Sequence, residues 1–504
     1  MHPINEIAKF YFSTRVPAID HFLSHPAETQ QRVLTHLLSR ARHTIYGRQY
    51  GFETIKSYRQ FAAQVPIHDY DGLKPWFQRM MDGEADVLWP GRIQWFAKSS
   101  GTTNDVSKFI PLSGEGLHRS HIKTGKDFLS IYLKNNPASR FFTGKGIVMG
   151  GAGNANAAHP DIFIGDVSAI LMKNLDTWIQ YFREPGLDVA LMPKWEEKLD
   201  RIASVTMQQN VTNISGVPSW TLLLLKKVLE KTGKTLISEV WPHLELYSHG
   251  GVGFAPYRKQ FEEIIGRPVF YQNVYNASEG FFAWQDTLDS DDMLLHLDNG
   301  VFYEFIPFNG NMKTQDAVNI DDVRPGVNYA MMISTNSGLW RYLIGDTVQF
   351  TSTAPHRIKI TGRTRQYINV WGEEVTVNNT DKAISESCAE MDVQVSEYTV
   401  APIHTDSYSS GRHEWAIEFS KEPADLGLFA RTLDQKLQSL NSDYAAKRSG
   451  GLVLDTLAVA PLNTGSFYQW MDRHHKLGSQ CKIPRLSNER KMIDELKDIS
   501  RVIR

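Results

Sequence analysis

The stretch that decides the fold reads IQWFAKSSGTTNDVSKFIPL and spans residues 93–112. Its two ends, IQWFA and FIPL, are apolar runs typical of strands, and the chain between them is rich in hydroxyl groups. At its centre lies Ser99-Ser100-Gly101-Thr102-Thr103, with Lys108 shortly after. Glycine lets the backbone amides turn inward, hydroxyls donate hydrogen bonds and lysine adds a positive charge. The pattern suits a phosphate-binding loop, but taken alone a polar surface turn is the more frequent explanation of such a segment. The chain contains no GxxxxGK[ST], so this is not a Walker loop.

Helix-like and strand-like segments alternate along most of the chain. Apolar residues at helical spacing predict helices at 27–46, from Trp195 to Val205, and at 219–232, the last opening at Ser219. Strand-like runs lie at 146–150, 268–276, 301–308, 329–335 and 347–352. This alternation predicts an α/β fold in which helices flank the sheets.

A second, smaller unit begins near the turn TGRTRQ at 361–366, which could serve as a hinge. Beyond it the pattern predicts a helix near 379–390, strands at 395–402 and 413–420, a long helix at 424–447 and a strand at 452–460. At roughly 150 residues per domain, 504 residues exceed what one uniform core supports. We therefore expect a domain over 1–361 and a small α/β sandwich over 362–504.

Composition excludes several classes of function. The 54 basic and 56 acidic side chains give a formal charge of −2, which leaves no field to hold nucleic acid. The two cysteines, Cys388 and Cys481, stand far apart without zinc-ligand spacing, which fits a reducing compartment. The N-terminus has no secretion-signal pattern and no apolar run reaches bilayer length. We expect a cytoplasmic protein that binds neither nucleic acid nor membrane.

Three further segments offer polar groups in patterns that bind ligands. Tyr275-Asn276-Ala277-Ser278-Glu279-Gly280 follows a strand-like run, where ligands collect in α/β sheets. Within the segment at 340–346, WRYLIGD, we expect a Gly345-Asp346 turn whose carboxylate could accept ribose hydroxyls. The third is Lys482 in CKIPR. Taken singly, each has an ordinary reading: a loop with a core tyrosine, a hairpin turn and a surface lysine.

The order of these motifs carries more information than any one of them. A hydroxyl loop, an aromatic-to-carboxylate segment, a Gly-Asp turn, a Gly-Arg hinge and a late lysine occur here in the order used by adenylate-forming enzymes. The sequence resembles the Gretchen Hagen (auxin-responsive) acyl acid amido synthetase family of that superfamily, most of all its bacterial branch. The resemblance covers nearly the whole chain, and its motifs are TIYGRQYGF at 44–52, SSGTT, YNASEGFFA at 275–283, WRYLIGD, GSFYQWMD at 465–472 and CKIPR.

The resemblance implies a fold and a set of residue roles. A large N-terminal domain, with flanked sheets and a small β-barrel-like part, would bind ATP and the acid, and a smaller mobile C-terminal domain would close over them. The phosphates would contact Ser99, Ser100, Gly101, Thr102, Thr103 and Lys108. The adenine pocket would be lined by Tyr275, Asn276, Ala277 and Ser278. Glu279 would hold Mg²⁺, Asp346 with Arg363 would bind the ribose, and Lys482 would be the catalytic lysine of the small domain.

The implied activity is adenylation of a carboxylic acid with release of pyrophosphate, followed by transfer of the acyl group to an amino acid. Transfer to coenzyme A and a non-catalytic ligand-binding protein are the alternatives. Segments 211–220 and 249–257 could supply an apolar acyl pocket through Trp220, Phe254 and Tyr257, and ordinary core is the other reading. Two departures from plant members stand out: Asp105-Val106 after the first motif, and Glu373-Glu374 where plant members carry a lysine. We expect a monomer.

Overall fold

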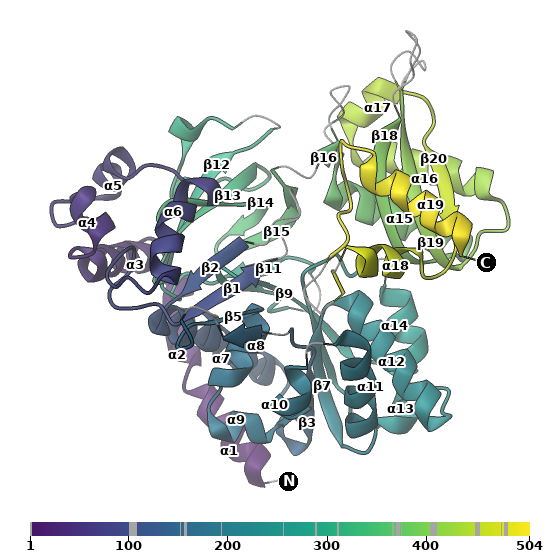
Figure 1. Cartoon of the computed structure of the whole chain (residues 1–504), viewed down its shortest axis with the longest axis horizontal. Helices are drawn as coiled ribbons and strands as arrows, with labels where there is room; N and C mark the ends of the chain where they lie inside the picture. The colour runs from purple at the N-terminus through teal and green to yellow at the C-terminus, as the bar shows by residue number, and fades with distance from the viewer. Residues whose placement is uncertain are drawn as a thin grey trace. The chain divides into compact units, whose positions relative to one another are not determined.

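The structure is a computed structural model of the chain. It describes residues 3–99, 108–151, 153–155, 159–192, 194–255, 257–287, 290–309, 312–364, 367–368, 373, 375–403, 411–448, 454–474, 476–477 and 482–503. The chain divides into two compact units (Figure 1). Unit 1 comprises residues 1–251, 265–308 and 312–359, and unit 2 comprises 252–264, 309–311 and 360–504. The mixed α/β class with a large and a small part is as the sequence predicts.

The main sheet of unit 1 has a parallel and an antiparallel half. The parallel half, in spatial order, is β6 (Arg183–Glu184), β3 (Lys145–Val148), β7 (Val211–Gly216), β8 (Leu246–His249) and β9 (Phe270–Ala277). The order then continues through β10 (Gly280–Trp284), β11 (Met293–Leu295), β15 (His356–Arg363), β14 (Tyr342–Thr353), β13 (Asn328–Thr335) and β12 (Val301–Pro307). Where we expected a barrel-like part, the antiparallel strands extend the parallel ones within one sheet. β9 is the strand at which the two halves meet.

A smaller sheet contains both ends of the segment at 93–112. Its order is β2 (Lys108–Leu112), β1 (Trp95–Ser99), β5 (Phe163–Gly165) and β4 (Gly153–Ala155). β1 and β2 pair antiparallel, and Ser99 is the partner of Lys108 at the open end of the pair. The two predicted strands therefore exist, and the hydroxyl-rich chain runs between their paired ends.

Helices cover these sheets. Before the small sheet come α1 (Pro3–Ser13), α2 (Val16–Ser24), α3 (Pro26–Ala41), α4 (Ile45–Gln49), α5 (Tyr58–Gln64) and α6 (Tyr70–Met81). After it follow the π-helix η1 (Gly116–Ile122), α7 (Lys123–Asn135), η2 (Phe141–Thr143), α8 (Val167–Asn174), α9 (Thr177–Tyr181), α10 (Leu187–Ala190), α11 (Trp195–Thr206), α12 (Pro218–Thr232) and α13 (Ile237–Val240). α14 (Arg258–Ile265) lies almost wholly in unit 2, and η3 (Thr314–Asp316) is a short 3₁₀ turn.

Two predicted helices differ from the observed ones at their ends. The helix predicted at 27–46 stops at Ala41, because Thr44 caps a new helix by accepting a hydrogen bond from the Gly47 amide at 2.9 Å. α12 begins at Pro218 rather than after Ser219, since proline is favoured in the first helical turn. Its end is as predicted, with Gly233 in the left-handed conformation.

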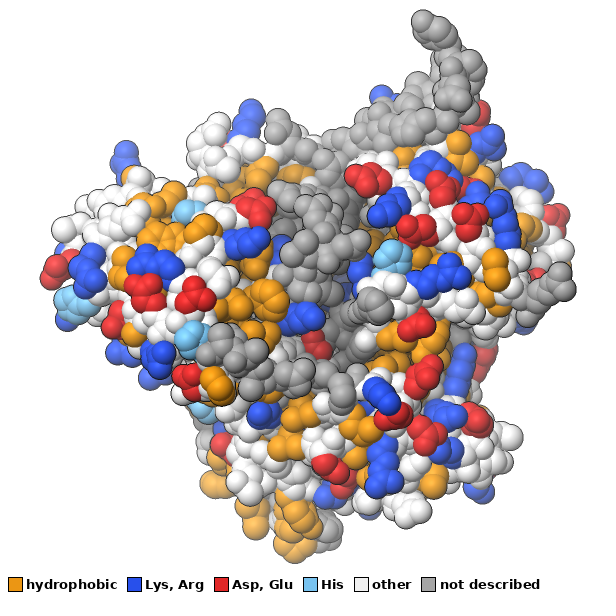
Figure 2. Space-filling view, viewed as in Figure 1, with side chains coloured by type: hydrophobic (Ala, Val, Ile, Leu, Met, Phe, Trp, Pro, Cys, Tyr) orange, Lys and Arg blue, Asp and Glu red, His pale blue; other side chains and the backbone are white. Residues whose placement is uncertain are grey.

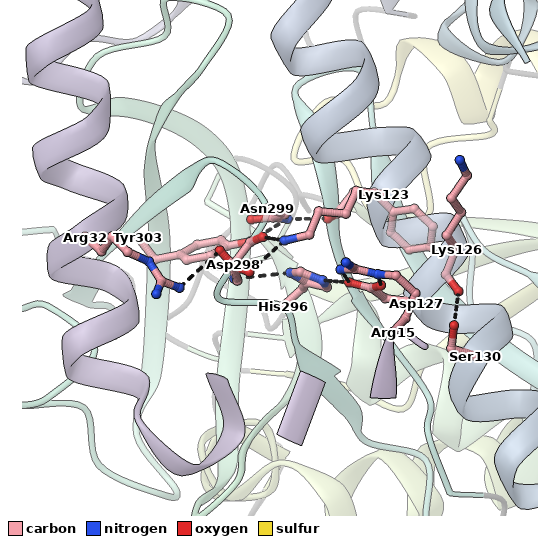
Figure 3. Close-up of polar contacts among 11 residues, drawn as sticks. Arg15, Arg32, Lys123, Lys126, Asp127, Ser130, His296, Asp298, Asn299 and Tyr303 are labelled. Atoms are coloured by element: carbon pink, nitrogen blue, oxygen red, sulfur yellow. Dashed lines mark hydrogen bonds and ion pairs between the residues drawn. The ribbon is translucent and has the colours of Figure 1, made fainter. Parts of the chain in front are cut away.

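A buried ion network ties the N-terminal helices to the main sheet (Figure 3). Arg15, just before α2, donates to both carboxylate oxygens of Asp127 on α7, at 2.7 and 3.1 Å. His296, after β11, lies 2.9 Å from the same carboxylate. Burial tends to raise the pKa of Asp127, but hydrogen bonds from His296 and Arg15 lower it overall. The carboxylate therefore stays charged in the core and fixes three distant segments.

Unit 2 is built on its own core. β18 (Gln394–Ile403), β19 (Arg412–Lys421) and β20 (Ala458–Leu462) form its sheet, with β16 (Tyr367–Ile368) and β17 (Val375–Thr376) as a separate pair. Its helices are α15 (Val377–Met391), α16 (Leu426–Leu440), α17 (Ser442–Arg448), α18 (Ser466–Arg473) and α19 (Lys491–Val502). Tyr398 stacks on Trp415 in this core, with ring centroids 5.3 Å apart.

The single long helix predicted at 424–447 is two helices, because Asn441 interrupts it. The Asn441 side chain accepts a hydrogen bond from the Tyr444 amide at 2.7 Å, which starts α17. The strand predicted at 452–460 begins later, at Ala458. None of the helices in the described part of the chain is long and apolar enough to cross a membrane.

Candidate nucleotide site and catalytic lysine segment

The hydroxyl-rich loop begins and ends on the paired strands β1 and β2. Ser100, Gly101, Thr102 and Thr103 lie outside the described residues, as does the side chain of Ser99. Lys108 is described: its Nζ lies 5.4 Å from the centre of the Tyr70 ring, a cation–π distance. The Tyr70 hydroxyl in turn accepts a hydrogen bond from the Phe109 amide at 3.0 Å. Lys108 is thus held at the mouth of the loop, and its contact with phosphate stays a prediction.

The segment 275–280 is a tight turn between two strands of the main sheet. Ala277 of β9 pairs with Gly280 of β10, so Ser278 and Glu279 form the two-residue connection. The turn therefore stands at the carboxyl end of β9, where the parallel half of the sheet meets the antiparallel half. Such edges are where open α/β sheets bind ligands.

The prediction of a turn at Gly345-Asp346 is wrong. β14 runs without a break from Tyr342 to Thr353, and Gly345 and Asp346 lie inside it. The register shifts opposite this point, because Met332 pairs with Leu343 whereas Ala330 pairs with Thr347. Gly345 has φ of 90°, so the pair forms a bulge in the strand rather than a hairpin turn. A bulge changes the direction in which the following side chain points.

Asp346 meets the other segment through that bulge. The Tyr275 hydroxyl donates a hydrogen bond of 2.6 Å to Oδ2 of Asp346, and both side chains are buried. The residues predicted to line the adenine pocket and to bind the ribose are therefore direct neighbours, although 71 positions separate them. Arg341, in the same WRYLIGD segment, points elsewhere: it donates 2.8 Å hydrogen bonds to buried Glu304 and to the Ala62 carbonyl.

His121 is a residue of this site that the sequence did not reveal. It lies on the π-helix η1, and its Nδ1 is 3.1 Å from Oδ1 of Asn276. Burial lowers the pKa of His121 to about 4, so the ring is neutral at pH 7. With the amide oxygen as acceptor, the ring carries its proton on Nδ1. The buried Nε2 makes no hydrogen bond to any described residue. The sequence alone does not distinguish His121 from a histidine that only packs in the core, since a π-helix has no sequence signature.

Lys482 belongs to unit 2 and precedes a firmly anchored stretch. Pro484 O accepts a hydrogen bond from the Thr399 hydroxyl at 2.7 Å, and Arg485 O accepts one from the Val400 amide at 2.9 Å. Leu486 bridges to Val400 as a short parallel strand contact. The stretch after Lys482 is therefore attached to β18 along its backbone.

The Arg485 guanidinium strengthens this attachment from inside the core of unit 2. It donates to the Tyr398 carbonyl and the Tyr257 hydroxyl, both at 3.0 Å, and forms an ion pair with Glu397. It also lies over the Tyr398 ring, 4.4 Å from the centroid. Burial raises the pKa of the neighbouring Asp381. The positive charge of Arg485 offsets part of this rise. Arg485 thus fixes a segment that begins three residues earlier with Lys482.

The segments around the expected hinge are partly described. β15 continues through Gly362 to Arg363, so Arg363 ends a strand instead of lying in a turn. Glu373 is fully buried and lies 3.0 Å from His413, also buried, so it is a core residue of unit 2. Glu373 is one of the positions at which the chain departs from the plant pattern. Glu374 lies outside the described residues.

The candidate acyl-pocket residues pack mainly as core. Trp220 lies edge-on to Trp195 with ring centroids 4.6 Å apart. Phe254 packs against Phe261 at 5.3 Å, and the Tyr257 hydroxyl bonds to Glu397 and Arg485 within unit 2. The contacts of these three side chains are therefore those expected of ordinary core residues.

The fold is the one found in solved adenylate-forming enzymes. The solved structure of the GH3.15 acyl acid amido synthetase superposes with a TM-score of 0.80 over 96% of this chain and 95% of its own, at 16% identity. In sequence, the chain is 22% identical to the indole-3-acetic acid-amido synthetase GH3.4 of Arabidopsis thaliana, covering 93% of this chain and 90% of that one. It is also 22% identical to the jasmonoyl–L-amino acid synthetase JAR6 of Nicotiana attenuata, covering 90% of both.

Three domains of one family match the chain in order. They are the GH3 family N-terminal domain at residues 15–269, the central domain at 294–363 and the C-terminal domain at 378–491. The chain belongs to the GH3 family, which confirms the family expected from the sequence. The relatives named above are plant proteins, and the expectation of a bacterial branch stays a prediction.

Proposed function

We propose that this protein is an ATP-dependent acyl acid amido synthetase, a ligase that adenylates a carboxylic acid and passes the acyl group to the amine of an amino acid. The observation that carries the proposal is the hydrogen bond between Tyr275 and Asp346, which joins two of the family's ordered motifs. Membership of the GH3 family and the 0.80 TM-score with an acyl acid amido synthetase support the same reaction.

The proposal assigns a nucleotide and Mg²⁺ to residues of these segments. Asp346 would accept the ribose hydroxyls, the turn from Tyr275 to Ser278 would border the adenine, and Lys108 with the hydroxyl loop would contact the phosphates. Glu279 would be a carboxylate ligand of Mg²⁺. No cluster of three or more acidic, histidine or cysteine side chains suited to a metal occurs among the described residues. Mg²⁺ commonly needs only one or two carboxylates, because substrate phosphates and water complete its coordination.

The physical task of such a site is to bring two anions together. The acid's carboxylate attacks the α-phosphorus of ATP, and pyrophosphate leaves with its electron pair. Positive charge and hydrogen-bond donors placed around the phosphates lower this barrier, and one such contact is worth about 10²- to 10³-fold in rate. Mg²⁺ supplies part of that charge when bound. Lys482 would supply charge at the carboxylate and the α-phosphate and would be the catalytic residue of unit 2.

The acceptor is tested directly by product analysis. The protein is incubated with ATP, Mg²⁺ and a panel of carboxylic acids, together with either an amino-acid mixture or coenzyme A, and products are read by mass spectrometry. The proposal expects an acyl amino acid, AMP and pyrophosphate. A thioester without amide would instead establish a coenzyme A ligase, and no turnover with any acid would favour a ligand-binding protein. We further infer a cytoplasmic location, in keeping with the sparse cysteines.

A further inference from the structure

An unusual amount of apolar surface is exposed at the N-terminal helix of unit 1. In α1, Ile7 is 69% and Phe10 75% exposed, and Ile4 and Tyr11 are each more than 40% exposed. Nearby, Tyr181 of α9 is 66% exposed. Most large apolar side chains of the described chain are buried, so this concentration on two helices requires an explanation.

These side chains form one continuous face. Ile4, Ile7 and Tyr11 follow one another at helical spacing along α1, and Phe10 lies one turn from Ile7. The Tyr11 ring contacts Trp178 of α9 edge-on at 5.4 Å, and Trp178 and Tyr181 are three positions apart on that helix. Figure 2 shows hydrophobic side chains gathered at the end of the molecule where Figure 1 places α1. We call the six residues Ile4, Ile7, Phe10, Tyr11, Trp178 and Tyr181 the α1–α9 face.

The face cannot be hidden by rotating α1, because the opposite side of the helix is fixed. Asn5 is buried, donates to the Ser139 carbonyl at 3.0 Å and accepts from the Phe142 amide at 3.1 Å. Phe12 stacks on the Phe142 ring with centroids 5.4 Å apart. Rotation would break both hydrogen bonds and leave buried polar groups unpaired.

The area of the face suits association with a second protein surface. Aromatic side chains offer about 150–250 Å² each, so at the observed exposures the four rings present roughly 450 Å². The isoleucines bring the apolar area to roughly 600 Å². Two such faces placed together would bury on the order of 1,200 Å², the lower end of the range for specific interfaces.

The charges beside the face point to a second copy of the chain rather than to a membrane. Lys9 pairs with Glu6 at 3.1 Å, and Lys126 with Asp176 at 3.1 Å. These lysines are therefore neutralised by neighbouring carboxylates, whereas binding to anionic lipid requires an excess of positive charge. A two-fold interface joins identical surfaces, so any charge at its edge must find the opposite charge on the same face.

We propose that two copies of this chain associate through the α1–α9 face to form a symmetric dimer. The face belongs to unit 1 and uses none of the residues assigned to nucleotide or acid. The monomer expected from the sequence is the competing prediction. An interface of this size, with few ion pairs to align it, is expected to dissociate in the micromolar range.

Sedimentation velocity of the full chain at increasing concentrations around 1 to 100 µM tests the dimer. We expect a concentration-dependent shift from monomer to dimer in the wild type, and at least a tenfold rise in the dissociation constant for Phe10→Glu and for Tyr181→Glu, which lies on the other helix. The matched control is Val502→Glu, because Val502 is 74% exposed but belongs to unit 2. Thermal unfolding of each variant shows whether the fold is kept.

Three outcomes would overturn the proposal. The wild type could remain monomeric at every concentration, or both variants could dimerise as the wild type does, which would place the interface elsewhere. The third outcome is a monomer that sediments with phosphatidylserine vesicles and loses that binding in Phe10→Glu, which would make the face a membrane-binding surface.

Discussion

The Tyr275 hydroxyl and the Asp346 carboxylate are joined by a buried hydrogen bond of 2.6 Å. Tyr275 lies near the end of β9, the last parallel strand of the main sheet, beside a register shift in its pairing with β10, and Asp346 follows a bulge in β14. The bond therefore joins two irregular points of one sheet. The bond fixes Oδ2 of Asp346 beside the turn that follows β9. We expect the carboxylate to accept hydrogen bonds from the ribose hydroxyls.

Replacing Tyr275 by phenylalanine tests that link. The ring stays and only the hydroxyl is lost, which removes a hydrogen bond to a charged group worth about 1.5–3 kcal/mol. We expect ATP binding, measured by calorimetry, to weaken several-fold while the thermal unfolding temperature falls by a few degrees. Unchanged affinity in a correctly folded variant would show that the bond does not orient Asp346 for the nucleotide.

Replacing Asp346 by alanine is predicted to act mainly on nucleotide binding. Loss of charge-assisted hydrogen bonds to the ribose is worth roughly 10- to 100-fold in the dissociation constant of ATP. Asp161→Ala is the control, since that carboxylate is half exposed. If the two variants bind ATP equally well, Asp346 is not a nucleotide ligand.

Lys482→Ala is predicted to reduce adenylation far more than ATP binding. The rate of acid-dependent pyrophosphate release should fall by about 10²- to 10³-fold, because a charge that acts in the transition state is lost. Lys491→Ala, at an exposed lysine of the same unit, should leave the rate unchanged. Equal and small effects of Lys482→Ala on both steps would remove it from catalysis.

Arg485 is predicted to act through Lys482 as a positioning residue. Arg485→Lys keeps a positive charge but loses the planar contacts to Tyr257, the Tyr398 carbonyl and Glu397. We expect a lower kcat with little change in KM for ATP. In the Lys482→Ala background the same substitution should have almost no further effect, as expected for two residues acting as a unit. Additive losses of kcat would show that Arg485 acts independently of Lys482.

The buried His121 predicts a specific dependence of stability on pH. Its pKa falls from 6.5 to about 4 on folding because of burial, so the unfolded chain binds a proton more readily between these values. This contribution is complete above pH 6.5 and is lost as the pH falls toward 4, at a cost on the order of 3 kcal/mol. His121→Gln should therefore flatten the fall in urea midpoint between pH 6.5 and 4.5. The exposed His118→Gln is the control and should follow the wild type; identical curves for His121→Gln would contradict the prediction.

The sequence predicts the class of fold and most of the helices and strands in which apolar residues repeat at regular spacing. Strands such as β12 and β13 and helices such as α11 were predicted within a few residues, because their apolar positions repeat at strand or helix spacing. The ends were less certain: Asn441 divides a helix and Thr44 starts one through single side-chain hydrogen bonds. Local capping of this kind does not change the apolar pattern.

The candidate site was predictable as a set of segments but not as a geometry. Gly345-Asp346 looked like a turn, since the pairing partner that makes it a bulge lies on β13, in another segment. His121 and Arg485 owe their positions to tertiary contacts with Asn276 and with Tyr398, which no local spacing predicts. Local motifs in the sequence therefore predict some residues of the candidate site. They do not predict residues whose place depends on contacts with distant segments.

The reversible formation of an acyl-adenylate tests the account most directly. The measurement is the exchange of labelled pyrophosphate into ATP, catalysed by the wild-type chain with Mg²⁺ and a panel of carboxylic acids, in the absence of amine and coenzyme A. The account predicts exchange that depends on an acid and is abolished or strongly reduced in Lys482→Ala. Hydrolysis of ATP to ADP and phosphate, with no acid-dependent exchange for any acid, would contradict it.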